Sequence, residues 1–304
     1  MREFTQQNQT LTKTDFDLLL KLALLEDVQT VGDLTCLALV PETAQGTATV
    51  VARTGGVLAG VPLIPHILSA VDSNLVWQPV LKDTAELTRG TVVGTIRGAA
   101  RGLLQAERPI LNFLGRLSGI ATLTKRYVDA IQGTKSKIYD TRKTTPGWRR
   151  LEKYAVGCGG GKNHRTGLYD AILIKDNHLA LGQQEGTPFS PAESVLRAKA
   201  FLQQRFSDPP MNIPIVEIEV DTLEQFRDVL PTEPDIILLD NMTPFQLAEA
   251  VRIRNSVQPD VQLEASGGIT LETVCRVAET GVERISVGAL THSAVSLDFG
   301  LDWE

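Results

Sequence analysis

The segments IVEIE at 215–219 and IILLD at 236–240 decide the fold of this 304-residue chain. Each is a short apolar run that ends on a carboxylate, and a helix-like segment lies between them. Four further short apolar runs lie at 137–141, 171–175, 261–265 and 285–287. Helical patterns occupy 191–206, 223–230, 244–255 and 271–279. Strands that alternate with helices indicate parallel pairing with right-handed crossovers. An α/β barrel and an open doubly wound sheet both fit this pattern.

The residues at the ends of the six runs favour the barrel. A polar, charged or glycine residue stands at or just after each end, namely Arg142, Lys175, Glu219, Asp240, Ser266 and Gly288. A barrel builds its active site from the carboxyl ends of all its strands, whereas an open sheet concentrates such residues at one switch point. Because six strands are clear, the barrel is predicted to be incomplete, with about six parallel strands.

The first third of the chain has a different rhythm. Short β-like runs at 47–52, 57–59, 75–81 and 91–96 are interspersed with helical stretches at 18–25 and 63–71, which predicts a sandwich-like α+β layer. A long helix is predicted from Glu107 to Gly133, with Pro109 in its first turn and Arg108 therefore at its N-terminus. We expect an N-terminal α+β domain at 1–115, a barrel at 116–290, and a tail at 291–304 that packs back on the N-terminal domain.

Composition excludes several classes of function. The net charge of −6 does not favour binding to nucleic acid or to an anionic membrane surface. The apolar runs are far shorter than the roughly 18 residues of a membrane span, and residues 1–14 are polar, unlike a secretory signal. The three cysteines lack metal-ligand spacing, which predicts a reduced, cytoplasmic protein. Cys158, beside a glycine run, is predicted to be a buried thiol and not a nucleophile.

Basic residues gather in the window 139–178 of this acidic chain. They are Arg142, Lys143, His164, Arg165 and Lys175. A charge-assisted hydrogen bond contributes about 1.5–3 kcal/mol, so several such donors exceed what one carboxylate needs. The window therefore predicts a pocket for a small ligand with several negative charges. The alternative is a solvated charged face.

Carboxylates and glycines complete the predicted rim. Glu219 and Asp240 follow successive strands and could hold Mg²⁺ and sugar hydroxyls, or could form salt bridges with the arginines. Ser266, Gly267 and Gly268 follow one strand and Gly288 follows the next. Glycines there allow backbone N–H groups to approach a phosphate, which in barrels often binds after the last two strands. Tight turns use the same residues.

Several blocks of sequence resemble the quinolinate phosphoribosyltransferase family. The blocks that span the basic window and the rim are DTRKTTPG at 140–147, GGGKNHR at 159–165, LIKDNH at 173–178, LDN at 239–241 and EASGGI at 264–269. Earlier blocks are ED at 26–27, GDLT at 32–35, AR at 52–53, GVLAG at 56–60, ER at 107–108, LNFL at 111–114 and SGIAT at 118–122. They run from about residue 26 onward in family order, so the resemblance is specific.

The resemblance implies a type II phosphoribosyltransferase-like fold. It also implies the Mg²⁺-dependent reaction of quinolinate with phosphoribosyl pyrophosphate, which gives nicotinate mononucleotide, pyrophosphate and CO₂ for NAD synthesis. By that resemblance the catalytic residues are Lys143, Lys175, Glu219 and Asp240. The residues expected to bind quinolinate are Arg108, Arg142, His164, Arg165 and Lys175. Those expected to bind phosphoribosyl pyrophosphate are Lys143, Glu219, Asp240, Ser266, Gly267, Gly268 and Gly288. Glu219 and Asp240 would hold Mg²⁺, and Arg108 would enter the site of the partner subunit in a homodimer.

Three other functions remain alternatives. A sister group associated with molybdenum uptake shares the fold and several motifs, although Lys175 to His178 match the transferase family better. Lys175 ends a strand, as the Schiff-base lysine of a barrel lyase would. A non-enzymatic binder of a phosphorylated ligand is the third alternative. One departure from the family pattern concerns Gly157, which stands where a basic residue is common and puts one phosphate contact in doubt.

Overall fold

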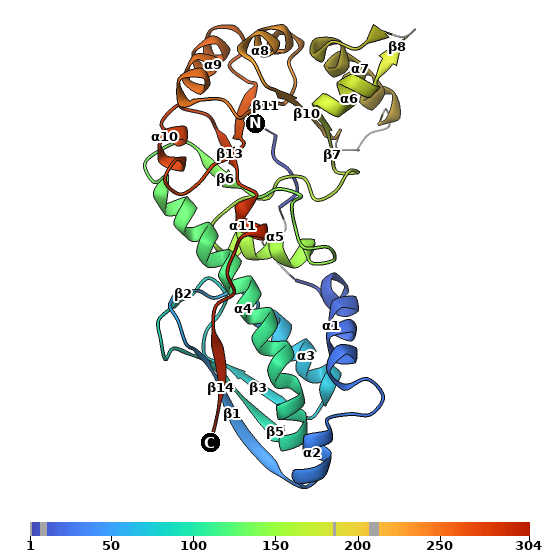
Figure 1. Cartoon of the computed structure of the whole chain (residues 1–304), viewed down its shortest axis with the longest axis vertical. Coiled ribbons are helices and arrows are strands. Elements are labelled where there is room, and N and C mark those ends of the chain that lie inside the picture. The colour runs from blue at the N-terminus through green and yellow to red at the C-terminus, as the bar shows by residue number, and fades with distance from the viewer. Residues whose placement is uncertain (1, 7–10, 185–186, 207–212) are drawn as a thin grey trace. The chain divides into compact units, whose positions relative to one another are not determined.

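The computed structural model describes residues 2–6, 11–184, 187–206 and 213–304 (Figure 1). The chain divides into two compact units. The first is formed by the segments Met1–Gln6, Arg126–Arg142 and Lys162–Gly288. The second is formed by the segments Gln7–Lys125, Lys143–Gly161 and Ala289–Glu304. The chain thus crosses between these units several times. The domain bounds 1–115, 116–290 and 291–304 stay a prediction. None of the helices in the described parts is long and apolar enough to cross a membrane.

The first unit contains a six-stranded parallel sheet. Its strands are β6 (Lys137–Tyr139), β7 (Ala171–Ile174), β10 (Ile215–Val220), β11 (Ile236–Asp240), β12 (Gln262–Ser266) and β13 (Arg284–Ser286). Their order is β6-β13-β12-β11-β10-β7, and every neighbouring pair is parallel. The six predicted strands and their parallel pairing are confirmed. The edge strands β6 and β7 are not neighbours in this sheet, which agrees with the incomplete barrel.

Helices follow these strands. The four predicted helical segments correspond to α7 (Pro191–Arg205), α8 (Leu223–Val229), α9 (Pro244–Val257) and α10 (Val274–Ala278). The short helices α6 (Asp176–Leu181) and η2 (Leu230–Thr232) were not predicted, and an antiparallel pair of β8 (Gln183–Gln184) and β9 (Thr187–Pro188) precedes α7. Thr222 and Thr243 are the N-caps of α8 and α9, and a glutamine three residues later completes each capping box. Because each helix begins within a few residues of the preceding strand, the loop between them is short. The polar residues of these loops therefore lie at the carboxyl ends of the strands.

The second unit contains a four-stranded antiparallel sheet. Its strands are β1 (Gln45–Ala52), β3 (Val76–Pro79), β5 (Val92–Ala99) and β14 (Phe299–Trp303), in the order β14-β1-β5-β3. The strands β2 (Gly56–Val57) and β4 (Glu86–Leu87) form a separate pair. The helices of this part of the chain are α1 (Lys13–Val28), α2 (Leu34–Leu39), η1 (Val61–Leu63), α3 (Ile64–Val71), α4 (Ala100–Ala130), α5 (Arg149–Cys158) and α11 (Ala289–His292).

The predicted start of the long helix is wrong. Helix α4 begins at Ala100, directly after β5, so Pro109 lies inside the helix and Arg108 is not at its N-terminus. Ala106 lies one turn before Ile110 and Leu103 lies two turns before it, and each is only 1 % exposed. The buried face of the helix therefore begins well before Ile110. Burial of this longer face outweighs the backbone hydrogen bond that a proline inside a helix removes.

Candidate functional site

A loop that follows α5 carries His164 and Arg165, and a buried carboxylate holds it in place. Asp140, at the end of β6, is fully buried and accepts hydrogen bonds from the side chain of Asn163 and the backbone N–H of His164, each at 2.8 Å. No separate role was predicted for Asp140 from the sequence. Its position could have indicated this role, because Asp140 is an acidic residue at the end of a predicted strand within the basic window. A carboxylate buried at such a position needs hydrogen-bond donors from its neighbours.

Two guanidinium groups lie near each other beside this loop. Arg165 is 6 % exposed, and its Nη1 donates to the carbonyl of Ala171 at 3.0 Å. Burial lowers the pKa of Arg165, and the nearby charge of Arg142 lowers it further. The buried Nε of Arg142 has no hydrogen-bond partner among the described residues. Two such cations with donors to spare form a site for an anion, because a bound carboxylate would satisfy the donors and relieve the repulsion.

Lys175, Glu219 and Asp240 meet at the carboxyl ends of β7, β10 and β11. Lys175 Nζ forms an ion pair with Glu219, and the Lys175 N–H donates to His178 Nδ1 at 2.9 Å. Burial raises the pKa of Glu219, Lys175 opposes that rise, and the negative charges of Asp240 and Asp176 add to it. A divalent cation would relieve this repulsion, and carboxylate oxygens are the ligands that Mg²⁺ prefers. Glu219 and Asp240 are therefore the residues that could hold Mg²⁺, and Lys175 is a further cation beside Glu219.

The glycine-rich turn after β12 has a geometry that demands glycine. Gly267 and Gly268 have φ values of +95° and +58°, and a Cβ on Gly267 would collide with the Asn241 side chain. The turn borders a cavity of about 200 Å³, whose lining includes Ser266, Gly268 and, from α10, Arg276. A cation beside these groups suits an anionic ligand, and no sequence pattern distinguished Arg276 from other surface arginines. Gly288 lies between β13 and α11.

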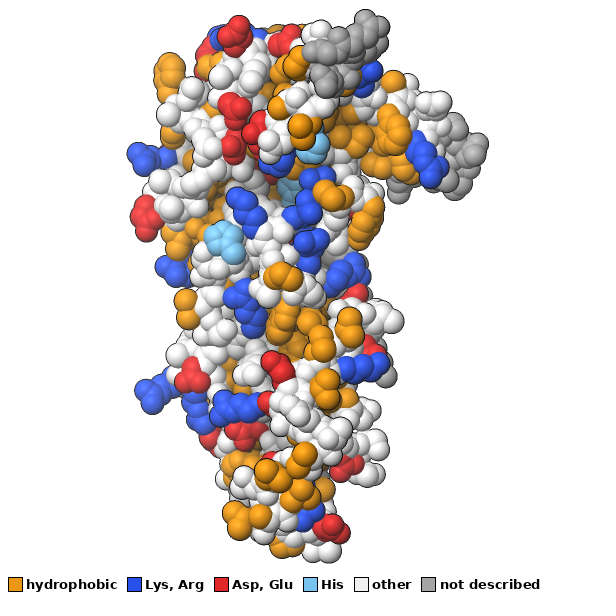
Figure 2. Space-filling model, turned by 45° about the vertical axis from the view of Figure 1, so that its right-hand side comes forward, with side chains coloured by type: hydrophobic (Ala, Val, Ile, Leu, Met, Phe, Trp, Pro, Cys, Tyr) orange, Lys and Arg blue, Asp and Glu red, His pale blue; other side chains and the backbone are white. Residues whose placement is uncertain are grey.

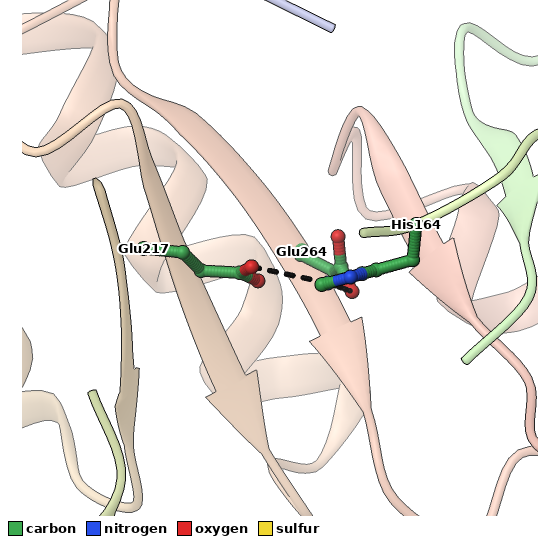
Figure 3. A group of neighbouring side chains, drawn as sticks. All are labelled: His164, Glu217 and Glu264. Carbon is green, nitrogen blue, oxygen red and sulfur yellow. Dashed lines mark ion pairs between the residues drawn. The ribbon is translucent and has the colours of Figure 1, made fainter. Parts of the chain in front are cut away.

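His164 points into the interior of the barrel and not toward its rim. Figure 3 shows its ring between Glu217 of β10 and Glu264 of β12. Its Nε2 lies 3.0 Å from Glu217 Oε2 and 3.5 Å from Glu264 Oε1, and its Nδ1 accepts the Arg165 N–H at 2.8 Å. Burial opposes the charged imidazole, but the two carboxylates outweigh burial and raise the pKa of His164. The Nδ1 contact limits that rise, because an acceptor nitrogen requires a singly protonated ring. Both ring nitrogens therefore have protein partners.

Arg284 compensates the charge of this interior cluster. Its Nε donates to Glu264 Oε2 at 2.7 Å, and its guanidinium lies 3.7 Å from the centre of the Tyr139 ring. Burial alone would raise the pKa of Glu264, but His164 and Arg284 together lower it. The ligand atoms of His164, Glu217 and Glu264 lie within 4.8 Å of one another, as a metal would need. Because Arg284 already compensates the charge of Glu264, and His164 Nε2 already lies against both carboxylates, we assign no metal to this cluster.

Comparison with known proteins identifies the family. The C-terminal and N-terminal domains of quinolinate phosphoribosyl transferase match residues 120–302 and 33–118. The chain belongs to the quinolinate phosphoribosyltransferase family. It is 45 % identical over 286 residues to the carboxylating nicotinate-nucleotide pyrophosphorylase of Mycobacterium leprae, which covers 93 % of this chain and 95 % of that protein.

Further relatives agree with this membership. The probable carboxylating nicotinate-nucleotide pyrophosphorylase of Bacillus subtilis is 42 % identical over 91 % of this chain and 90 % of its own length. The structure of the nicotinate-nucleotide pyrophosphorylase from Francisella tularensis superposes with a TM-score of 0.87, at 34 % identity and 99 % coverage of both chains. The type II phosphoribosyltransferase-like fold expected from the sequence is thereby confirmed.

Two of the predicted site residues, Lys143 and Arg108, lie in the second unit. Lys143 is exposed, and its backbone carbonyl accepts a hydrogen bond from Thr291 at 2.8 Å. The Arg108 side chain is 69 % exposed on α4 and lies 3.4 Å from Glu107. The contributions of Lys143 and Arg108 to the site remain predictions.

The surroundings of Cys158 disfavour its thiolate form. It ends α5 in the second unit and is half-buried. Burial, with a smaller contribution from Asp83, raises its pKa to about 12. Since the thiolate is the reactive form of cysteine, this agrees with the expected structural role and not with a nucleophile.

Proposed function

We propose that this chain transfers the phosphoribosyl group of phosphoribosyl pyrophosphate to quinolinate and releases CO₂, giving nicotinate mononucleotide. The observation that carries the proposal is the pair of guanidiniums, Arg142 and Arg165, with unused donors, in a chain whose relatives bear the names of this activity. Those relatives support this reaction over the molybdenum-uptake group and over a Schiff-base lyase. The ion pair between Lys175 and Glu219 also argues against the lyase, because it engages the amine that would have to form the Schiff base.

The two carboxylates of quinolinate match the cations of the first unit. Arg142 and Arg165 would bind them through planar guanidinium forks, and Lys175 would add a point charge. Since both nitrogens of His164 have protein partners, we propose that it supports Arg165 and does not itself bind a carboxylate. Ser266, Gly267, Gly268 and Gly288 would bind the 5′-phosphate through backbone N–H groups, and Lys143 would add charge beside the pyrophosphate.

The proposed chemistry needs no covalent enzyme intermediate. The ring nitrogen forms a bond to the anomeric carbon of ribose as the bond to pyrophosphate breaks, and the nitrogen becomes formally positive. The adjacent carboxylate then leaves as CO₂, its electron pair stays on the ring carbon, and a proton from solvent is added there. The positive nitrogen stabilises that carbanion. Quinolinate and phosphoribosyl pyrophosphate are both anions and repel each other in solution. The protein contributes to catalysis by holding them together in the orientation that the reaction needs.

Glu219 and Asp240 are proposed to hold the ribose hydroxyls and Mg²⁺. When bound, Mg²⁺ supplies positive charge that stabilises the departing pyrophosphate. We expect Asp240→Asn to lower kcat at least about 100-fold at 1 mM Mg²⁺, with partial recovery at high Mg²⁺, because it removes one anionic ligand. The Asp260→Asn variant is the control for loss of an exposed carboxylate after α9. Full activity of Asp240→Asn in a chelator would contradict the metal role.

A homodimer is proposed to complete the site. Large apolar side chains are exposed along α1 and α2 of the second unit, and hydrophobic surface is visible toward the α2 end of that unit (Figure 2). These side chains are Leu18, Leu22, Leu25, Leu34, Leu37 and Leu39. Apolar surface concentrated on two neighbouring elements is typical of a protein interface. The exposed Arg108 would then enter the partner's site, as the family resemblance implies.

Mixing two inactive variants tests this arrangement. Arg108→Ala and Lys175→Ala dimers are mixed and allowed to exchange subunits. If Arg108 acts in the partner's site, each hybrid dimer has one intact site, and activity returns to about a quarter of wild type. Arg165→Ala mixed with Lys175→Ala should stay inactive, because both residues belong to one unit of one subunit. No recovery in the first mixture, with exchange verified by labelled subunits, would contradict the shared site.

The direct test of function is product formation. Purified protein is incubated with quinolinate, phosphoribosyl pyrophosphate and Mg²⁺, and nicotinate mononucleotide is measured by chromatography. The proposal expects product only when all three are present. Consumption of phosphoribosyl pyrophosphate with another acceptor would overturn the choice of acid, and no consumption with any acceptor would overturn the transferase activity. The absence of nucleic-acid binding and a cytoplasmic location stay predictions.

A further inference from the structure

We propose that the segment Arg2–Gln6 is a positioning element of the acid-binding site, holding the loop that carries His164 and Arg165. The inference rests on the proposed function, since it concerns the site for quinolinate. The segment precedes both domain matches, which begin at residues 33 and 120, yet it belongs to the first unit with the barrel strands.

Gln6 holds the loop through its backbone. The Gln6 side-chain Nε2 donates to the carbonyl of Asn163 at 3.0 Å, and its Oε1 accepts the N–H of the same residue at 2.9 Å. Asn163 is fully buried, so neither backbone group has water as an alternative partner. Asp140 accepts from the Asn163 side chain and the next N–H, as described above. Gln6 therefore holds the backbone of Asn163, and Asp140 holds its side chain and the N–H of the next residue. Both contacts lie directly before Arg165.

Phe4 packs against the imidazole that supports Arg165. Phe4 is 4 % exposed, and its ring stacks on His164 with centroids 4.4 Å apart and 26° between planes. It belongs to a buried cluster with Ala171, Ile215 and Ile236, at the start of β7, β10 and β11. Since the ring of His164 is held by Glu217 and Glu264 at Nε2, stacking on its face restricts the remaining rotation. The Nδ1 atom is then kept in place to accept the Arg165 N–H.

Polar contacts anchor the segment to the barrel on either side of Phe4. The Glu3 carboxylate accepts from the Tyr139 hydroxyl at 2.8 Å, on edge strand β6. The Arg2 guanidinium pairs with Asp235 at 3.0 Å, and the Arg2 carbonyl accepts from the Gln262 side chain at 2.9 Å. The segment is thus tied to β6, to β12 and to the residue before β11. A rigid attachment of this kind lets a segment remote in sequence set the position of a site residue.

The expected consequence is a specific loss of affinity for the acid. Without Gln6, the Asn163 backbone loses two hydrogen bonds, and of these two residues only Asp140 still holds the loop. Gln6→Ala is expected to raise the KM for quinolinate roughly tenfold, with the KM for phosphoribosyl pyrophosphate changed less than twofold. Gln6→Glu keeps the acceptor for the Asn163 N–H and loses the donor, so its effect should be intermediate. A merely structural role would move both KM values or neither.

The experiment compares full-length wild type, Gln6→Ala, Gln6→Glu, Phe4→Ala and the exposed control Thr5→Ala in steady-state kinetics with each substrate varied. Thermal unfolding midpoints show whether each variant is folded at the assay temperature. If Phe4→Ala is not folded, Gln6→Ala alone tests the inference. A selective rise in the quinolinate KM for Gln6→Ala, absent in Thr5→Ala, supports the inference. Active wild type with an unchanged quinolinate KM in Gln6→Ala overturns it. Inactive wild type would instead overturn the proposed function.

Discussion

Arg165→Ala is expected to lower kcat/KM for quinolinate by roughly 10²- to 10⁴-fold, because we propose that the lost guanidinium donates two charge-assisted hydrogen bonds to one carboxylate. The same variant should keep its affinity for phosphoribosyl pyrophosphate in equilibrium binding, since the residues predicted to bind the 5′-phosphate lie at the ends of β12 and β13 and in the loops that follow them. Steady-state kinetics and calorimetric titration measure the two effects separately.

Arg165→Lys is the matched variant for this prediction. It keeps the charge and removes the planar fork, so it should recover only a small part of the loss. Equal activities of Arg165→Lys and wild type would mean that charge alone matters at this position. An Arg165→Ala variant within threefold of wild type would contradict the assignment of this residue to the acid.

Arg284→Ala is expected to destabilise the first unit by about 3–5 kcal/mol, because it leaves the buried carboxylate of Glu264 without its guanidinium partner. The midpoint of thermal unfolding should fall by roughly 10 °C. Replacing both partners, in Arg284→Met with Glu264→Leu, should restore much of the loss, since an apolar pair carries no uncompensated charge. Calorimetry or circular dichroism measures the midpoints.

The pH dependence of this effect has a defined sign. The folded protein lowers the pKa of Glu264, so the ionised carboxylate contributes stability above the pKa of the unfolded chain, and that contribution is lost as pH falls through the folded pKa. The gap between wild type and Arg284→Ala should therefore narrow in acid. Arg252→Ala, which breaks an exposed pair with Glu249, is the control and should leave the midpoint unchanged. A similar midpoint for Arg284→Ala and Arg252→Ala would contradict the role of the buried pair.

The barrel could be predicted from sequence because its signal is local. Runs such as 236–240 are apolar, short and separated by helical segments with caps, and each strand end places a polar residue at the same edge of the sheet. The meeting of Lys175 with Glu219 follows from that arrangement alone, because parallel neighbours bring their carboxyl ends together. Pattern and position therefore predicted that Lys175, Glu219 and Asp240 lie at one edge of the sheet.

Other features depend on contacts between residues far apart in the chain. The inward direction of His164 follows from Glu217 and Glu264, which the sequence presents only as acidic residues inside otherwise apolar strands. Gln6 is 157 residues away from the backbone that it holds, and no periodic pattern marks it. The start of α4 was mistaken because Pro109 is typical of a first helical turn, while the buried face upstream, at Leu103 and Ala106, decides where the helix begins.

The most direct measurement follows the carbon that leaves. Quinolinate labelled with ¹³C in the carboxylate next to the ring nitrogen is incubated with the protein, phosphoribosyl pyrophosphate and Mg²⁺, and labelled CO₂ and nicotinate mononucleotide are measured together. We expect one labelled CO₂ for each nucleotide formed, and the loss of both in Arg165→Ala. Nucleotide that retains the label, or turnover that is insensitive to Arg165→Ala, would contradict the account of an arginine-bound dicarboxylate that loses CO₂ on transfer.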